Sequence, residues 1–64
     1  MLTVQVKYAS GAELVQRAQE VFVESCNTAL VIVNGGVQDD IVLCEGDYAE
    51  IKNDNGVVVR TVGE

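Results

Sequence analysis

The sequence predicts a small all-β domain, and three observations favour that fold class. The first segment alternates apolar and polar residues, valine dominates the apolar content, and short turn signals rich in glycine and asparagine separate the later apolar runs. Sixty-four residues are enough for one domain, over residues 1–64. We expect a small antiparallel sheet of hairpins with a barrel-like form.

Residues 2–8 form the clearest predicted strand. Leu2, Val4, Val6 and Tyr8 point one way, and Thr3, Gln5 and Lys7 point the other. This period of two is typical of a strand with one buried and one wet face.

Residues 10–25 allow two interpretations. The apolar residues recur at helical spacing: Leu14, Val15, Ala18, Val21 and Phe22. Against a helix, Ser10-Gly11 directly follows an alternating strand, which is a hairpin signal, and the segment ends in poor helix formers without a closing glycine. The alternative to the all-β fold is therefore an α+β fold, in which one helix at about 11–24 packs on an antiparallel sheet.

The second half of the chain reads as further strands. Residues 28–33 are apolar on both faces, which predicts a strand inside a sheet rather than at its edge. Asn34-Gly35-Gly36 ends this strand, because these residues tolerate a positive φ. Ile41 to Cys44 continues as a strand, and Glu45-Gly46-Asp47 forms the next turn.

The last two strands should form a hairpin around Asn53-Asp54-Asn55-Gly56. A type I turn that ends in a left-handed Gly56 places an apolar pair on one face and an opposite-charge pair on the other. The pairs expected in this register are Ile51 with Val59, Glu50 with Arg60 and Tyr48 with Val62. Val58, Val62 and Tyr48 would then give the sheet a valine-rich outer face.

Four short motifs extend over most of the chain. They are Lys7-Tyr8-Ala9-Ser10-Gly11-Ala12-Glu13, Ala18-Gln19-Glu20-Val21-Phe22-Val23, Glu45-Gly46-Asp47 and Asn53-Asp54-Asn55-Gly56. In this order the chain resembles small strand-rich accessory proteins encoded by bacteriophages and prophages. The resemblance implies that the first motif is a hairpin tip and that the second begins another strand, and it favours the all-β fold.

The composition argues against an enzyme. The chain has no histidine, so its serines and cysteines lack the usual base that activates a nucleophile. Cys26 and Cys44 form no CxxC pair and cannot complete a tetrahedral zinc site by themselves. We expect both to be free thiols packed as small hydrophobic residues, and we expect no metal and no cofactor.

Charge is the strongest functional signal. Ten acidic residues against four basic ones give a net charge of −6, which argues against direct nucleic-acid binding. The acids concentrate between Gln38 and Asp54, where Lys52 is the only cation. The predicted partner-binding residues are Asp39, Asp40, Asp47 and Glu50, with Asp39 and Asp40 in an exposed loop. They would offer an acidic patch to a protein with a basic surface.

The resemblance, together with the acidic surface, implies a non-catalytic function: a phage-type accessory protein that binds and blocks a host factor, such as a component of a bacterial defence system. Two alternatives stay open, a structural or virion-associated assembly module and an oligomer that binds a signalling nucleotide. The second would need Lys7, Arg17, Lys52 or Arg60 in a pocket.

The high apolar content predicts a homo-oligomer, a dimer. No secretory signal or long apolar run is visible, so we expect a protein of the host-cell cytoplasm without membrane contact.

Overall fold

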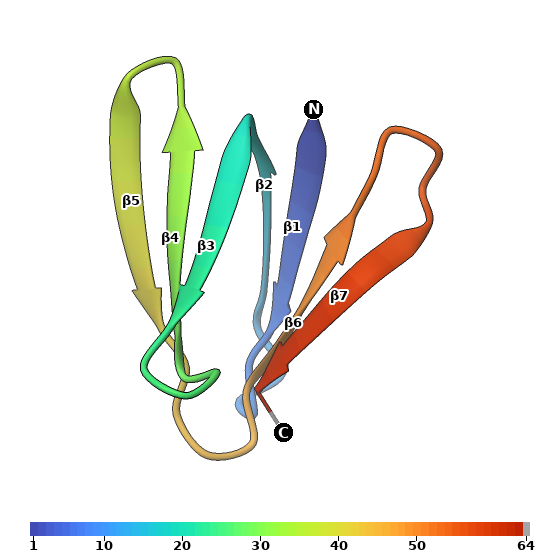
Figure 1. The fold of residues 1–64 in the computed structure, drawn as a ribbon. Helices are drawn as coiled ribbons and strands as arrows, with labels where there is room; N and C mark the ends of the chain where they lie inside the picture. The colour runs from blue at the N-terminus through green and yellow to red at the C-terminus, as the bar shows by residue number, and fades with distance from the viewer. Residues whose placement is uncertain (64) are drawn as a thin grey trace.

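The computed structural model describes residues 1–63 and shows an all-β chain (Figure 1). The strands are β1 (Leu2–Lys7), β2 (Glu13–Ala18), β3 (Glu20–Glu24), β4 (Ala29–Asn34), β5 (Val37–Val42), β6 (Tyr48–Lys52) and β7 (Val58–Gly63). The predicted fold class is confirmed. The alternative helix at about 11–24 is wrong, because this segment forms β2 and β3. Residues 1–63 contain no helix that could cross a membrane.

The strands form two antiparallel sheets. One has four strands in the order β2-β1-β6-β7, and the other has three in the order β3-β4-β5. Figure 1 shows the three-stranded sheet beside the four-stranded one, with β5 and β7 at the two outer margins of the view.

The two sheets are joined at Gln19, where the chain leaves β2 and enters β3. The Gln19 amide donates a hydrogen bond to the Val33 carbonyl at 2.9 Å, and the side-chain amide of Asn34 donates to the Arg17 carbonyl at 3.3 Å. One long extended segment therefore contributes to both sheets, with a change of direction at Gln19. Such corners are how strands pass from one sheet to another in small orthogonal packings.

The core lies between the inner faces of the two sheets. Its buried residues are Val4, Val6, Ala18, Leu30, Ile32, Leu43, Ala49, Ile51 and Val62. Val4 and Val6 are buried in β1, as their alternation predicted. The central strand β4 supplies Leu30 and Ile32, so the prediction that residues 28–33 lie inside a sheet is confirmed.

The β6–β7 hairpin keeps the predicted turn but not the predicted register. Gly56 has a φ of 77°, its amide donates to the Asn53 carbonyl at 3.0 Å, and Lys52 pairs with Val58 as expected. Beyond that pair the register shifts and Val59 becomes an extra residue. The observed pairs are Ile51 with Arg60, Glu50 with Thr61, Ala49 with Val62 and Tyr48 with Gly63, so the expected pairs of Ile51, Glu50 and Tyr48 are wrong.

The physical reason for this correction is the burial of Val62. In the expected register Val62 would face outward beside Tyr48. The irregularity at Val59 changes which residues of β7 face the core, so that Val62 lies opposite Ala49 and is only 1% exposed. The valine-rich outer face expected from Val58, Val62 and Tyr48 therefore does not form.

Candidate functional site

The four predicted site residues do not form one patch. Asp39 and Asp40 lie in strand β5 rather than in a loop, although both are exposed as expected. Successive residues of a strand face opposite sides, so their carboxylates diverge. Asp40 lies opposite Val31 on the outer face of the three-stranded sheet, whereas Asp39 lies opposite the buried Ile32 and accepts a hydrogen bond from the Gln16 side chain at 2.9 Å.

Asp47 has a structural role. It is only 8% exposed, and its carboxylate accepts hydrogen bonds from the backbone amides of Ala9 at 2.7 Å and Cys44 at 2.9 Å. These two bonds, the one from Ala9 first, hold the pKa of Asp47 below its usual value. The carboxylate ties the β1–β2 turn to the loop that leads into β6, and it is not available on the surface.

Glu50 lies on the outer face of the four-stranded sheet. Its carboxylate is 3.5 Å from the Lys7 ammonium, which also lies 5.5 Å from the centre of the Tyr48 ring. Interactions with Tyr48 first and with Glu50 second raise the pKa of Lys7. Glu50 is therefore paired within the fold, on a different sheet from Asp40.

This outer face of the four-stranded sheet is named the polar face. It consists of Thr3, Gln5, Lys7, Glu13, Val15, Arg17, Tyr48, Glu50, Lys52 and Thr61. Its side chains bond to one another across strands: the Lys52 ammonium donates to Gln5 at 3.1 Å, and the Gln5 amide donates to Glu13 at 3.0 Å. Three of the four cations of the chain lie here, on a sheet surface rather than around a hollow.

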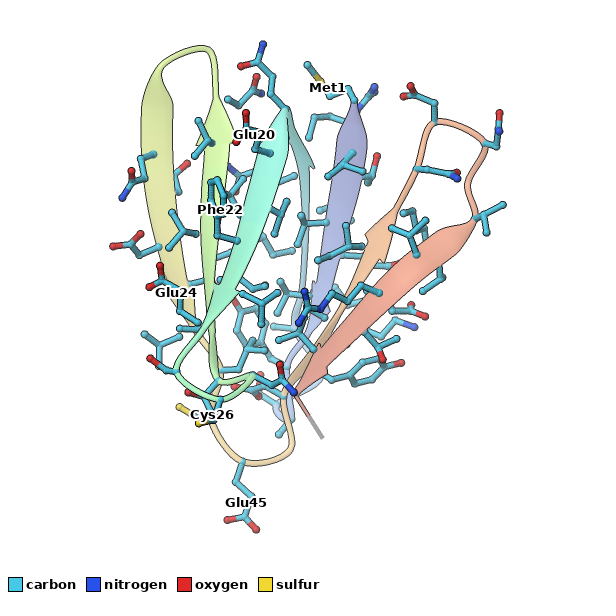
Figure 2. All side chains as sticks on the ribbon, viewed as in Figure 1. Met1, Glu20, Phe22, Glu24, Cys26 and Glu45 are labelled. Carbon is cyan, nitrogen blue, oxygen red and sulfur yellow. The ribbon has the colours of Figure 1, made fainter. Side chains whose placement is uncertain are left out.

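The outer face of the three-stranded sheet has a different character. We name it the Phe22 face, and it consists of Glu20, Phe22, Glu24, Ala29, Val31, Val33, Gln38, Asp40 and Val42. Phe22 is 49% exposed and Val42 is 69% exposed, and Val31 lies between Phe22 and Asp40 across the three strands. Figure 2 shows Glu20, Phe22 and Glu24 at successive positions along β3.

The acids of the Phe22 face lie on a sheet without lysine or arginine, and the ion pairs found among residues 1–63 involve Asp54 and Glu50 instead. The sequence contains no lysine or arginine between Arg17 and Lys52, so the whole three-stranded sheet and its connecting loops lack positive charge. The result is an apolar strip, from Phe22 through Val31, flanked by Glu20, Glu24 and Asp40. A surface of this kind suits a partner with an apolar centre and a basic rim.

Of the residues on the Phe22 face, the sequence analysis singled out Asp40 but not Phe22. The segment Glu20-Val21-Phe22-Val23-Glu24 carries the signal, because in a strand it places two acids and the aromatic ring on one face and two valines on the other. If the segment were a helix, Phe22 would instead lie on its apolar face, among the predicted core residues. Phe22 could therefore be recognised as a surface residue only once residues 20–24 were known to form a strand.

A shallow hollow at the opposite end from the β4–β5 turn contains both thiols. Its volume is about 540 Å³, and its lining residues are Cys26, Asn27, Thr28, Leu43, Cys44, Glu45, Asp47 and Gly63. Cys26 and Cys44 are free as expected, but both are exposed, so the prediction that they are packed inside is wrong. Cys26 belongs to a turn in which three consecutive non-glycine residues have positive φ, and no cation lines the hollow to stabilise a thiolate.

Among residues 1–63, no three histidine, cysteine or acidic side chains gather in a way that could hold a metal ion. Comparison of the chain with protein-family models, with curated proteins and with solved structures finds no match.

Proposed function

We propose that the chain is a non-catalytic binding protein that captures a protein with a basic surface through its Phe22 face. One observation carries the proposal: the only phenylalanine of the chain is half exposed at one end of an apolar strip whose flanking charges are all acidic. Aromatic residues at the centre of an interface commonly supply most of its binding energy. The chain has only two other aromatic residues, both tyrosines, so the exposed ring of Phe22 is the side chain that we expect to be buried in a pocket of the partner.

The acids give the face its selectivity. Glu20, Glu24 and Asp40 attract a basic partner over several ångströms and disfavour an acidic one, which raises the association rate at low salt. Asp39 adds a charge at the neighbouring edge. Asp47 and Glu50 are engaged within the fold. The proposed binding set therefore leaves them out, keeps Asp39 and Asp40, and adds Glu20, Phe22 and Glu24.

The biological role that we propose is that of a phage-type accessory protein which blocks a host factor, such as a component of a bacterial defence system. The role rests on the resemblance of the turn motifs, and the acidic Phe22 face supports it. A small protein of this charge can occupy a basic groove that the host factor needs for its own ligand. The groove residues of the partner would contact Phe22 and the acids around it.

Affinity capture from a bacterial host lysate tests the proposal. The immobilised proteins are the wild type, Phe22→Ser, and Asp39→Lys with Asp40→Lys. A matched control carries Glu13→Lys with Glu45→Lys, which changes the net charge equally but leaves the Phe22 face intact. A partner held by the wild type and the control, but lost from both the Phe22→Ser protein and the Asp39/Asp40 double variant, supports the proposal. Equal retention by all four proteins contradicts it.

Self-association is the second candidate function. Val57, just before β7, and Val58 and Val59, its first two residues, are 56%, 40% and 55% exposed. Such a run of exposed valines favours burial against another chain. We expect a dimer in light scattering at micromolar concentration. A mass of 6.9 kDa across a dilution series would contradict this expectation.

A further inference from the structure

Strand β5 has one unpaired edge. It is the last strand of the three-stranded sheet and pairs only with β4 among the described residues. All six of its residues form regular pairs with β4, without the irregularity found in β7. A regular open edge is the template on which an added strand can form main-chain hydrogen bonds.

The hydrogen-bond pattern identifies the amides that face this open edge. The Leu43 amide donates to the Thr28 carbonyl at 2.7 Å, which makes this pair a hydrogen-bonded one. Because such pairs alternate with non-bonded pairs in an antiparallel ladder, Ile41, Asp39 and Val37 also bond to β4. The backbone groups of Gln38, Asp40 and Val42 therefore point away from β4, toward solvent.

The side chains beside this edge carry negative charge on both faces of the sheet. Asp40 lies on the Phe22 face and Asp39 lies on the opposite face, and both are exposed. The hydrogen bond that Asp39 accepts comes from the neutral Gln16 amide, so its charge is not compensated. An added strand would meet these carboxylates with two consecutive residues, one on each face.

We propose that the open edge of β5 accepts an extended strand of a basic partner, in which two adjacent lysine or arginine residues lie opposite Asp39 and Asp40. This inference rests on the proposed function and specifies the form of the partner. The added strand would extend the three-stranded sheet, and its outward side chains would continue the Phe22 face beyond Val42. Main-chain bonds to Gln38, Asp40 and Val42 would supply affinity, and the dibasic pair would supply selectivity.

Charge argues against a second copy of the chain as the occupant. Pairing of β5 with itself would bring Asp39 and Asp40 close to the same residues of the other copy, and like charges across a strand pair are destabilising. Strand β7 of a second copy offers one cation, Arg60, next to the irregularity at Val59. A dibasic strand from another protein satisfies both carboxylates.

The probe for this proposal is a synthetic peptide as long as β5, with a central Lys-Arg pair flanked by alternating threonine and valine. A control peptide has a Glu-Glu pair instead. Hydrogen exchange by NMR reports on each amide of the whole chain. We expect the basic peptide to slow exchange at Gln38, Asp40 and Val42 at least about tenfold, while Val37, Asp39 and Ile41 are already slow without it.

Two variants test the edge and the charge separately. Gln38→Pro removes one outward N–H but no bond to β4, and it should weaken peptide binding about tenfold relative to Gln38→Ala. Slow exchange at Asp39 and Ile41 in this variant shows that the β4–β5 ladder is intact. Asp39→Asn with Asp40→Asn should weaken binding by a similar factor, whereas Glu45→Gln should not.

Three outcomes would overturn the proposal. The first is peptide binding that perturbs Phe22 but leaves the amides of Gln38, Asp40 and Val42 fast; it would leave the proposed function standing. The second is protection of these amides that rises with protein concentration alone, which would make a second copy the occupant. The third is the absence of peptide binding at millimolar concentration, while capture by the Phe22 face is tested independently by the Phe22→Ser variant.

Discussion

The outer faces of the two sheets differ in whether their charged side chains have partners within the fold. On the polar face, cations bond to acidic or amide side chains across the strands, as in the contacts of Lys7 with Glu50 and of Lys52 with Gln5. On the Phe22 face, the acids flank an exposed apolar strip, and the three-stranded sheet contains no lysine or arginine. Most of the charged side chains of the polar face thus find partners within the fold, whereas the acids of the Phe22 face remain open to a partner protein.

This difference shows why acidic content alone is a poor guide to a binding site. The carboxylates of Asp47 and Glu50 contribute to the fold, one through two backbone amides and the other through Lys7. The carboxylate of Asp40 has no such partner among the described contacts and lies on the strip that contains Phe22. Position on the sheet, rather than local charge density along the sequence, separates the two groups.

The largest expected effect comes from charge reversal on the Phe22 face. Glu20→Lys with Glu24→Lys should lower the affinity for a basic partner roughly 100-fold at low salt, since each reversal replaces an attraction with a repulsion. Glu13→Lys with Glu45→Lys changes the net charge by the same amount. Titration calorimetry at low salt compares the two variants, and equal losses of affinity would show that net charge, not the Phe22 face, controls binding.

Removal of the aromatic anchor should have the next largest effect. Phe22→Ser should weaken partner binding by about 2 kcal/mol, as expected for a central aromatic contact. Because Phe22 is half exposed, the free energy of unfolding should fall by no more than about 1 kcal/mol. The buried Ile32→Ala variant, in contrast, should lose about 2–4 kcal/mol of stability. Urea denaturation separates the two cases, and a large loss for Phe22→Ser would mean that this side chain serves the core.

The turn that completes the four-stranded sheet provides a smaller, purely structural effect. Gly56→Val should lower the free energy of unfolding by roughly 1–2 kcal/mol, because Gly56 has a positive φ. Nothing lies within 4 Å of the position that a Cβ would take, so backbone strain is the only cause. An unchanged denaturation midpoint would show that the turn has another conformation, and partner binding should not change.

The smallest expected effect concerns Asp47 and pH. Its pKa is lower in the folded chain than the ordinary value of 3.8, so its contribution to stability is complete above that value and is lost as the pH falls through the folded pKa. In Asp47→Asn the fall of stability between about pH 5 and about pH 2 should be shallower than in the wild type. Urea midpoints across this range test the prediction, and parallel curves for the two proteins would contradict it.

Much of the fold follows from the sequence because a period of two is a strong signal. This period correctly identified β1. The segment 28–33, which is apolar on both faces, correctly identified β4 as a central strand. The ambiguity between helix and strand at residues 11–24 has a specific origin at Gln19, where the chain changes sheets. Leu14 and Ala18 face the core before this corner, and Val21 faces it afterwards. The corner therefore changes which alternate residues face the core, from even-numbered to odd-numbered ones, and the resulting spacing resembles that of a helix.

The rest could not be predicted because it depends on contacts distant in sequence. The extra residue at Val59 is selected by the burial of Val62 against Ala49, which no local pattern near the turn reveals. The burial of Asp47 likewise depends on the amide of Ala9, in a turn far along the chain. Of the candidate site, the exposed acids of β5 could be predicted, whereas Phe22 could be found only once β3 was known to be a strand.

The most direct test of the account is the hydrogen-exchange footprint of a captured basic partner on this protein. We predict that complex formation slows exchange in β3 and β5, within residues 20–24 and 37–42, and leaves the strands of the polar face unchanged. Protection confined to residues 13–18 and 48–52, with β3 and β5 unaffected, would contradict the claim that the Phe22 face is the binding surface.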